Sequence, residues 1–562
     1  MRVFNINKGV GLASSGVEYA QKYRRELLAG IPEVEDYYLF TDYLGTNIAM
    51  FTDRLGFDRS QVLWLYHLIT GRSTQPNSVT VDAFRAGLDG EYSQTREATG
   101  RLVFRKQGSR VWYRVLQALG FVDRVETWTT DAAGASVLLS VAHYDSALHN
   151  VEHCAAGAVV RRTFYTLDGR VAAEQYVKNG EILQTRLTPA SPLWSAAGGV
   201  RCGRTGGAET GRISRRALRY TGEVICHGRA ELFRLVFSSM LTCCDDIVLV
   251  DRAVDVIDAV YPVIGDRRLM SVVHAEHYDL KQADDGVLLW NNHYENVFTR
   301  PDLVDTVVVS TRQQQRVLRR QLREAGMTQE VAWIPVGYAA GLAAGEGTAD
   351  GAPEPPEWRP HSLVTASRLA SEKHLDMVVR AVTKARKQVP DLTLDIYGEG
   401  TRGPIVEAIA EANAGGFVTL KGHQNLDGVL GTYGLYVSAS TSEGFGLSLL
   451  EAIAQGLPLV GFDVEYGNRE FVEPGVNGEL VAYTGDGVSD EAALAEAMVQ
   501  VVTSDRLAAM RQASVDKAAE FAPDKVRALW RHCLVGRECL VGAADVKGEA
   551  GAEIADGRSE AA

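Results

Sequence analysis

The sequence contains no long apolar run. No segment approaches the roughly 18–20 consecutive apolar residues of a membrane-spanning helix, and the start, M-R-V-F-N-I-N-K-G-V-G, resembles a strand entering a glycine loop rather than a signal peptide. An excess of positive charge is also absent, because 58 Lys and Arg stand against 71 Asp and Glu, for a net charge of −13. Nucleic-acid binders need the opposite balance. We therefore expect a cytoplasmic protein with no nucleic-acid partner.

Cysteine is scarce and shows no pairing pattern. The seven cysteines include no C-x-x-C motif and are odd in number. They stand at Cys154, Cys202, Cys226, Cys243, Cys244, Cys533 and Cys539. A scattered set of this kind favours reduced thiols over a disulfide framework or a zinc site.

Metal-binding patterns are missing as well. His274 and His277 stand in H-A-E-H, which differs from H-E-x-x-H, and no third ligand is evident. The acidic doublets at 245–246 and 284–285 could be tested as ligands of a metal–diphosphate complex, but neither has D-x-D spacing. The sequence therefore favours chemistry that needs neither a metal nor a separate cofactor.

What is present is a chain of 562 residues, too long for one core. Short apolar runs such as Val3–Ile6, Ile247–Asp251 and Leu435–Ala439 alternate with helical patterns, which is typical of parallel strands buried on both faces. Between them lies a region of alternating strands joined by turn signals such as Asp168-Gly169 and Asn179-Gly180, which predicts antiparallel hairpins.

These patterns predict an α/β protein with two Rossmann-like domains that face a cleft and an antiparallel β-meander inserted in the first domain. The expected sections are a first part of domain I (1–74), the inserted hairpin module (75–222), a second part of domain I (223–338), a Gly/Ala/Pro-rich linker (339–360), domain II (361–542) and a disordered tail (543–562).

The most informative motif is T-S-E-G-F-G-L-S-L-L-E at 441–451, where Glu443 and Glu451 lie eight positions apart. A strand should end just before it, and a helix should begin at Leu447. Two carboxylates and the free N–H groups of a helix start would then share one small site. Such a site suits a hydroxyl-rich ring beside a phosphate, as in a nucleotide sugar.

Two cations are expected near this motif. Arg368 and Lys373 follow the first strand of the second domain, in A-S-R-L-A-S-E-K-H, and suit a diphosphate. A solvated basic helix start is the alternative. Because both this segment and the Glu443 turn follow strands of one parallel sheet, we expect them to meet at its carboxyl edge.

Three further segments are weaker candidates. His274 ends a strand and could contact a sugar hydroxyl, although a structural histidine is the default. The loop Gly9–Gly16 could approach an anion or be a tight turn. The loop with His423 and Gln424 could hold a uracil base or simply pack. The stretch 201–220 holds six arginines and one Glu, and is either a solvated flexible loop or a contact for anionic lipid or a partner subunit.

Taken together, the chain resembles a known family. E-G-F-G-L-S-L-L-E is similar to the E-x7-E motif of retaining GT-B glycosyltransferases. The stretches V-V-H-A-E-H-Y, L-W-N-N-H-Y-E, V-T-A-S-R-L-A-S-E-K-H and G-F-D-V-E-Y-G-N narrow the resemblance to the catalytic A subunits of accessory Sec-system protein O-GlcNAc transferases. It runs from residue 1 to about residue 535, and departs from the family at 201–220 and in the length of the linker.

This resemblance implies metal-independent transfer of GlcNAc from UDP-GlcNAc to Ser or Thr of a serine-rich protein, with retention. It implies four catalytic residues, namely Glu443, His274, Arg368 and Lys373. UDP would contact Gly16, Val17, Glu18, Tyr19, Arg368, Lys373, His423, Gln424 and, through the ribose, Glu451. The GlcNAc would contact His274, Glu443, Gly444, Phe445 and Gly446.

The resemblance also implies a homologous non-catalytic B subunit, which the inserted hairpins would bind together with the unfolded acceptor, and a peripheral position at the inner face of the membrane. Two rival functions stay open. One is a transferase that uses the same donor on wall teichoic acid or another glycan. The other is a non-catalytic partner or chaperone subunit, although such a subunit should have lost the donor-site charges that this sequence keeps.

Overall fold

The computed structural model describes residues 1–11, 16–196, 224–251, 256–279, 288–339 and 357–536. The arginine-rich stretch, the doublet at 284–285, most of the expected linker and the expected tail lie outside these residues. All five described cysteines are free. Among the described helices, none is both long and apolar enough to cross a membrane.

The first parallel sheet has seven strands in the order β17-β16-β15-β14-β1-β2-β3. Its strands are β1 (Arg2–Asn7), β2 (Glu35–Phe40), β3 (Val62–Trp64), β14 (Ile247–Asp251), β15 (Arg268–Val273), β16 (Thr306–Val309) and β17 (Glu330–Trp333). The helices between them are α1 (Gly16–Leu28), α2 (Ala49–Thr52), α3 (Leu65–Thr70), α7 (Gly228–Met240), α8 (Ile257–Ile264), α9 (Glu295–Thr299) and α10 (Arg312–Glu324). The strand order reverses between β1 and β14, which marks where ligands of such sheets bind.

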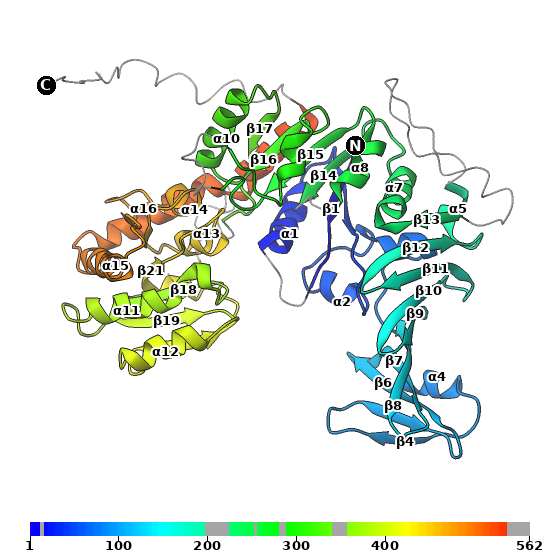
Figure 1. Cartoon of the computed structure of the whole chain (residues 1–562). Helices are drawn as coiled ribbons and strands as arrows, with labels where there is room; N and C mark the ends of the chain where they lie inside the picture. Colours follow the sequence, from blue (N-terminus) through cyan, green and yellow to red (C-terminus); the bar gives the residue numbers. More distant parts are fainter. Residues whose placement is uncertain (12–15, 197–223, 252–255, 280–287, 340–356, 537–562) are drawn as a thin grey trace, which may run out of the picture.

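The inserted module enters between β3 and β14 and forms one antiparallel sheet of ten strands, β4 to β13 in sequence order. The strands are β4 (Ser93–Arg96), β5 (Leu102–Arg105), β6 (Val111–Ala118), β7 (Phe121–Thr130), β8 (Ser136–Tyr144), β9 (Leu148–Ala155), β10 (Ala158–Tyr165), β11 (Val171–Lys178), β12 (Glu181–Leu187) and β13 (Val224–His227), with α4 (Val81–Ala86) and α5 (Pro192–Ala196). Asn179 and Gly180 both have positive φ and join β11 to β12 as a two-residue turn, as predicted. The sheet projects as an arm (Figure 1).

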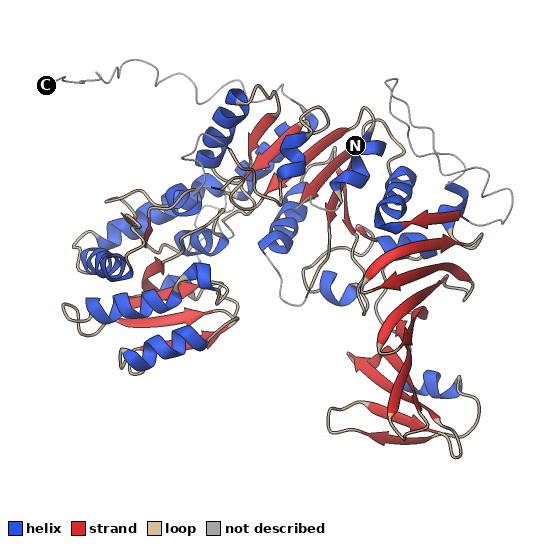
Figure 2. Ribbon diagram, viewed as in Figure 1, coloured by secondary structure: helices blue, strands red, loops and turns tan. Residues whose placement is uncertain are grey.

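The second parallel sheet has six strands in the order β20-β19-β18-β21-β22-β23, with its reversal between β18 and β21. Its strands are β18 (Arg359–Ala366), β19 (Thr393–Tyr397), β20 (Val418–Gly422), β21 (Tyr433–Ser438), β22 (Leu459–Phe462) and β23 (Gly478–Val481). The helices are η2 (Ser371–Lys373), α11 (Leu375–Ala385), α12 (Gly403–Glu411), η3 (Leu430–Thr432), α13 (Leu447–Ala454), α14 (Gly467–Phe471), α15 (Gly487–Val502), α16 (Leu507–Ala518) and η4 (Ala519–Phe521). Figure 2 shows both lobes as layers of helix and strand, in contrast to the arm.

The last described helix, α17 (Pro523–Val535), returns to the first sheet. Its buried residues Val526, Trp530 and Leu534 share a core with residues of β1 and β14. Arg268 at the start of β15 donates hydrogen bonds to the carbonyls of Cys533 and Leu534, at 2.8 and 2.9 Å, which stabilises the end of the helix. The range expected for domain II includes this helix, whose buried side chains belong to the core of the first sheet.

Candidate active site

The carboxyl ends of the two parallel sheets meet at the Gly-Phe-Gly turn of the second lobe. A Cβ added to Gly444 would lie 2.3 Å from the carbonyl oxygen of His274 and 3.1 Å from the Cα of Ala275. The turn therefore rests directly on the backbone that follows β15, and only glycine allows this approach. The predicted sugar turn and the predicted histidine are brought together, although they come from different sheets.

The shape of the turn follows from its sequence. Phe445 is buried against Phe471 and Phe521, with ring centroids 5.0 and 6.1 Å apart. Gly446 has a φ of +88° and precedes the first residue of α13, a conformation that a side chain would strain. The helix begins at Leu447, as predicted, and its start lies beside Glu443, because a Cβ added to Gly446 would lie 3.3 Å from the Cγ of Glu443.

Glu443 forms an ion pair with Lys373. The Nζ of Lys373 lies 2.5 Å from Oε2 of Glu443, and the two side chains are 14% and 18% exposed. The backbone of Glu443 is fixed as well, because its carbonyl accepts from the N–H of Gly467 at 2.9 Å. A cation and a carboxylate are thus held together at the carboxyl edge of the sheet, where sequence reasoning expected both.

Arg368 lies at the same edge but is not part of this pair. It follows β18, the strand beside the reversal of the second sheet. Its side chain is 69% exposed and contacts Glu372 at 3.1 Å. The structure therefore places Arg368 near the expected site by strand order, with its guanidinium turned to a neighbour on its own segment.

Glu451 lies where the two lobes meet again. Its Oε1 is 3.4 Å from the hydroxyl of Tyr23, on α1 of the first lobe. Burial, together with the charge of nearby Asp427, raises the pKa of Glu451 to about 7, against the opposing effects of Tyr23 and Lys22. A carboxyl group with this pKa changes its charge near neutral pH.

The first turn of α1 holds the predicted UDP contacts of the first lobe. Gly16 begins the helix and has open space where a side chain would stand. Val17 and Glu18 are buried and Tyr19 is half-buried. The carboxylate of Glu18 accepts a hydrogen bond from the N–H of Gly11 at 3.0 Å, which joins the two described ends of the first glycine loop.

His274 follows β15, and its ring contacts a buried carboxylate of the neighbouring strand β14. Its ring Nε2 lies 2.6 Å from Oδ1 of Asp251, the last residue of β14. The backbone N–H of His274 donates to the hydroxyl of Tyr294 at 2.9 Å. Asp251 also contacts Arg24 on both carboxylate oxygens. Burial alone would raise the pKa of Asp251, but Arg24 and His274 outweigh it and hold that pKa well below the usual range. Sequence reasoning missed Asp251, whose only signal was a charged residue closing an apolar strand.

His277 has a structural role. Its side chain is fully buried, with Nε2 2.7 Å from Oε1 of Gln321 and its ring close to Tyr466 of the second lobe. Burial lowers its pKa to about 4, so it is neutral at physiological pH. Asp246 is likewise structural, because Arg2 holds its carboxylate at 2.7 and 2.8 Å.

His423 and Gln424 lie in an exposed loop after β20. The side chain of Gln424 donates to the carbonyl of Lys421 at 3.0 Å. The same loop leads to Asp427, whose charge acts on Glu451. A residue that sequence reasoning missed, Tyr436 of β21, connects the surrounding segments, because its hydroxyl donates to the carbonyl of Ala366 at 2.8 Å and lies 2.9 Å from the hydroxyl of Ser448.

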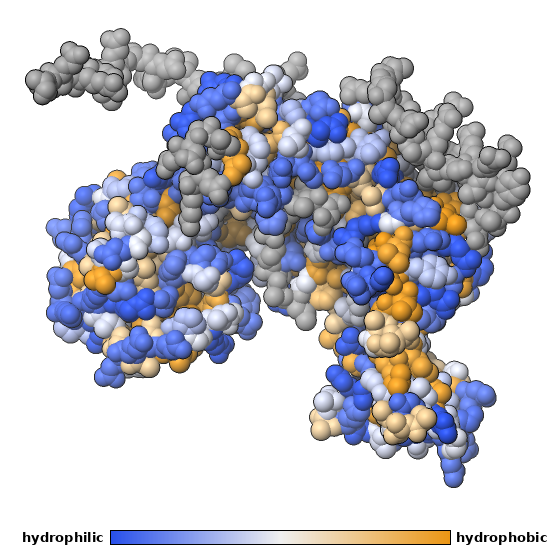
Figure 3. Space-filling view, in the orientation of Figure 1, coloured by the Kyte–Doolittle hydropathy of each residue, from blue (hydrophilic) through white to orange (hydrophobic). Residues whose placement is uncertain are grey.

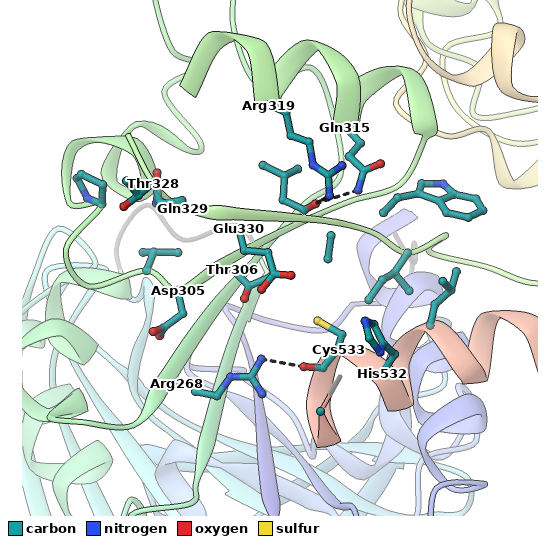
Figure 4. A pocket seen from close by; sticks show the side chains of 18 of the residues that line it. Arg268, Asp305, Thr306, Gln315, Arg319, Thr328, Gln329, Glu330, His532 and Cys533 are labelled. Carbon is teal, nitrogen blue, oxygen red and sulfur yellow. Dashed lines mark hydrogen bonds between the residues drawn. The ribbon is translucent and has the colours of Figure 1, made fainter. Parts of the chain in front are cut away.

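A cavity of about 760 Å³ lies elsewhere (Figure 4). It is lined by Arg268 and Thr306 at the amino ends of their strands, by Gln315 and Arg319 of α10, and by His532 of α17. Ligands of parallel sheets bind at the carboxyl ends, so this cavity is separate from the candidate active site.

Comparisons with known proteins agree with this geometry. Residues 360–504 match the family described as glycosyl transferases group 1. The chain is 34% identical to the GtfA subunit of the UDP-N-acetylglucosamine–peptide N-acetylglucosaminyltransferase of Streptococcus gordonii over 542 residues, which is 95% of this chain and 98% of that protein.

Two solved structures are similar over 95% of this chain. The pneumococcal O-GlcNAc transferase GtfA in complex with UDP and GlcNAc has a TM-score of 0.80 at 32% identity, covering 95% of this chain and 98% of that one. The crystal structure of a GtfA/B complex gives the same TM-score and identity, covering 95% and 99%. The predicted GT-B architecture with its antiparallel insert is confirmed. The chain belongs to the family of glycosyltransferases formed by the GtfA subunits of UDP-N-acetylglucosamine–peptide N-acetylglucosaminyltransferases.

Proposed function

We propose that this protein transfers N-acetylglucosamine from UDP-GlcNAc to Ser and Thr hydroxyls of a protein acceptor, with retention and without a metal. The observation that carries the proposal is the ion pair of Lys373 and Glu443, held by Gly444 against the backbone of His274. A cation suited to a diphosphate and a carboxylate suited to a sugar thus lie together at the carboxyl edge of one sheet, in a chain of the GtfA family.

The chemistry assigned to each residue follows from its charge and place. In the transfer, the bond between the anomeric carbon and UDP breaks, the acceptor oxygen bonds to that carbon from the same face, and the acceptor proton passes to the departing diphosphate. Lys373 and Arg368 stabilise the negative charge that develops on the diphosphate. The first turn of α1, from Gly16 to Tyr19, offers it backbone N–H groups.

The remaining contacts hold the sugar and the nucleoside. Glu443 and the turn Gly444–Gly446 bind the GlcNAc hydroxyls, and His274 contacts the ring from the opposite sheet. Glu451 binds the ribose, and the loop with His423 and Gln424 binds the uracil. Supporting this assignment, the turn and His274 are in contact and the helix of Tyr23 touches Glu451.

A comparison of donors and acceptors tests the proposal. We expect UDP release from UDP-GlcNAc to exceed that from UDP-Glc and UDP-GalNAc, and to rise on adding a Ser-rich peptide but not polyribitol phosphate. Mass spectrometry should find the peptide heavier by one N-acetylhexosamine. Stimulation of UDP release by polyribitol phosphate alone would support the rival function in teichoic-acid glycosylation. The absence of UDP release with all three donors would favour a non-catalytic subunit.

The charge of Glu451 should set how donor binding depends on pH. An ionised carboxylate accepts hydrogen bonds from both ribose hydroxyls, whereas a protonated one accepts fewer. Because the pKa of Glu451 is raised to about 7, the ionised fraction rises between about pH 6 and about pH 8. We expect the KM for UDP-GlcNAc to fall by up to about tenfold over this range.

The control for this prediction is Glu451→Gln, which removes the titration and keeps the shape. Its KM should be higher than that of the wild type at the upper pH and nearly independent of pH. If the variant shows the same pH dependence as the wild type, another group is responsible.

We also propose that a homologous B subunit binds the inserted sheet. Val160, Tyr176 and Leu183 are 42%, 39% and 53% exposed and lie on the neighbouring strands β10, β11 and β12. Val160 and Leu183 stand at irregularities of the strand pairing, where a bulge turns an apolar side chain outward. We call these three residues the bulge patch, and Figure 3 shows apolar residues along the arm. Exposed apolar surface of this kind marks a partner site, and a GtfA/B complex is known for a similar protein.

Charges placed in the bulge patch should prevent that assembly. We expect Tyr176→Asp combined with Leu183→Asp to raise the Kd for the B subunit by about 100-fold or more, because each substitution would bury an unpaired charge in the interface. Light scattering after gel filtration measures the complex. Val406→Asp, at a side chain that is 50% exposed on α12, is the matched control and should leave assembly intact. Equal binding by the double variant would show that the partner docks elsewhere.

A further inference from the structure

A buried carboxylate stands behind the candidate sugar-binding histidine. Asp251 is the last residue of β14 and its side chain is fully buried. Its Oδ1 lies 2.6 Å from Nε2 of His274 and 2.8 Å from Arg24, and its Oδ2 lies 2.8 Å from Gln21 and 2.9 Å from Arg24. The four atoms that contact this carboxylate come from three residues and are all nitrogens.

Charge balance explains why Asp251 stays ionised at this depth. An isolated buried carboxylate is strongly unfavourable, and the two-fold contact with Arg24 neutralises it. Arg24 is itself buried and held by the side-chain oxygen of Asn5 at 2.9 Å. The pair of Arg24 and Asp251 therefore needs no further charge, and the contact with His274 is additional to what neutralisation requires.

The ionised carboxylate determines the tautomer of His274. A carboxylate only accepts, so the ring nitrogen facing it, Nε2, must carry a proton. In a neutral imidazole the other nitrogen, Nδ1, is then an acceptor. Nδ1 has no hydrogen-bond partner among the residues that the structure describes. The ring thus offers one acceptor, in a fixed orientation, beside the Gly444 turn.

The location of the pair favours a role in the site over one in the fold alone. β14 borders the point where the strand order of the first sheet reverses, and ligands bind outside the carboxyl ends of strands there. Asp246, just before the amino end of the same strand, is also buried and pairs with the partly exposed Arg2, but it contacts no histidine among the described residues. The two pairs resemble each other, and only the one at the carboxyl end is coupled to a candidate site residue.

We propose that Asp251 is a positioning residue for the transfer reaction. Together with Arg24, it holds His274 in the tautomer whose Nδ1 accepts a hydrogen bond from a hydroxyl of the donor sugar. This inference rests on the proposed function, because it assigns a role to Asp251 within that site. It identifies a sugar hydroxyl, rather than a phosphate, as the group that His274 recognises, since an acceptor nitrogen repels anionic oxygen.

A double-mutant cycle with Asp251→Asn and His274→Ala tests it. Asparagine keeps the size of the side chain but removes the charge that fixes the tautomer. We expect D251N to lower kcat/KM for UDP-GlcNAc on the order of 10–100-fold, as for other groups that orient a site residue. The Kd for UDP, which lacks the sugar, should change less than about twofold. In the His274→Ala background, D251N should add less than about twofold.

The matched control is Asp246→Asn, which breaks the pair with Arg2 just before the amino end of β14 and should leave kcat/KM nearly unchanged. The inference is overturned if D251N is as harmful in the His274→Ala background, or if it weakens UDP binding to the same extent as transfer. A wild-type protein that releases no UDP from any donor would instead contradict the proposed function.

Nitrogen NMR provides a readout that does not depend on activity or on the folding of D251N. In wild-type protein labelled at histidine nitrogen, the His274 signals, identified by their loss in His274→Ala, should show a protonated Nε2 and an unprotonated Nδ1 when the ring is neutral. Observation of the opposite tautomer would overturn the inference even if the D251N variant did not fold.

Discussion

Replacement of Lys373 with alanine is expected to lower kcat for GlcNAc transfer on the order of 10²–10³. The Lys373 side chain is 14% exposed and its Nζ lies 2.5 Å from Oε2 of Glu443, so its charge is little screened by water. Negative charge grows on the diphosphate as the bond to the sugar breaks, and a fixed cation stabilises this state more than the bound donor. The effect should therefore be larger on kcat than on KM.

Initial rates of UDP release at saturating UDP-GlcNAc measure this change. Lys384→Ala is the matched control, because Lys384 lies on the nearby helix α11 and pairs with Glu491 at 2.8 Å. We expect the control to keep at least half of the wild-type rate. If Lys373→Ala also turned over within about threefold of the wild type, Lys373 would not act on the leaving group.

Replacement of Gly444 with alanine is expected to lower kcat/KM by about 100-fold or more. The new Cβ would lie 2.3 Å from the carbonyl oxygen of His274, and the neighbouring contact is also backbone, so no side chain can move to relieve it. The turn and the end of β15 must then separate. A displacement of about 1 Å between groups that bind one substrate can cost on the order of 10² in rate.

Gly416→Ala is the matched control for this prediction. Gly416 lies in the same lobe and has ordinary φ, and a Cβ added there would meet no atom within 4 Å. Both variants should keep the wild-type far-ultraviolet circular dichroism, because the clash lies between lobes rather than within one core. Wild-type kcat/KM in Gly444→Ala would show that the contact between the turn and His274 is not needed for transfer.

Local sequence signals predicted most of the elements that carry the site. Apolar runs bounded by polar residues indicated the strands β14, β18 and β21, since burial on both faces requires continuous apolar sequence. Helix α13 begins at Leu447 because glycine with positive φ precedes it, which the E-G-F-G sequence indicated. Asn179-Gly180 predicted its hairpin for the same reason, the steric freedom of asparagine and glycine at positive φ.

The contacts between distant segments were not visible in the sequence. Asp251 could be read as the end of a strand, but its partners Arg24 and His274 lie on two other elements. Nothing local in the segment of α17 indicated that its buried side chains would pack against β1 and β14. Arg368 was expected beside Glu443, and its exposed pairing with Glu372 depends on rotamers that sequence does not specify.

The sequence by itself determined the two α/β lobes, the antiparallel insert and the family motif around Glu443. It did so because the periodicity of apolar residues, the turn residues and the helix-start signals are local properties of the sequence. The tertiary structure alone decided that Gly444 rests on the backbone of His274, that Tyr23 reaches Glu451, and that Asp251 orients the histidine. These contacts join residues up to 428 positions apart, and they depend on how two separate sheets pack at their carboxyl ends.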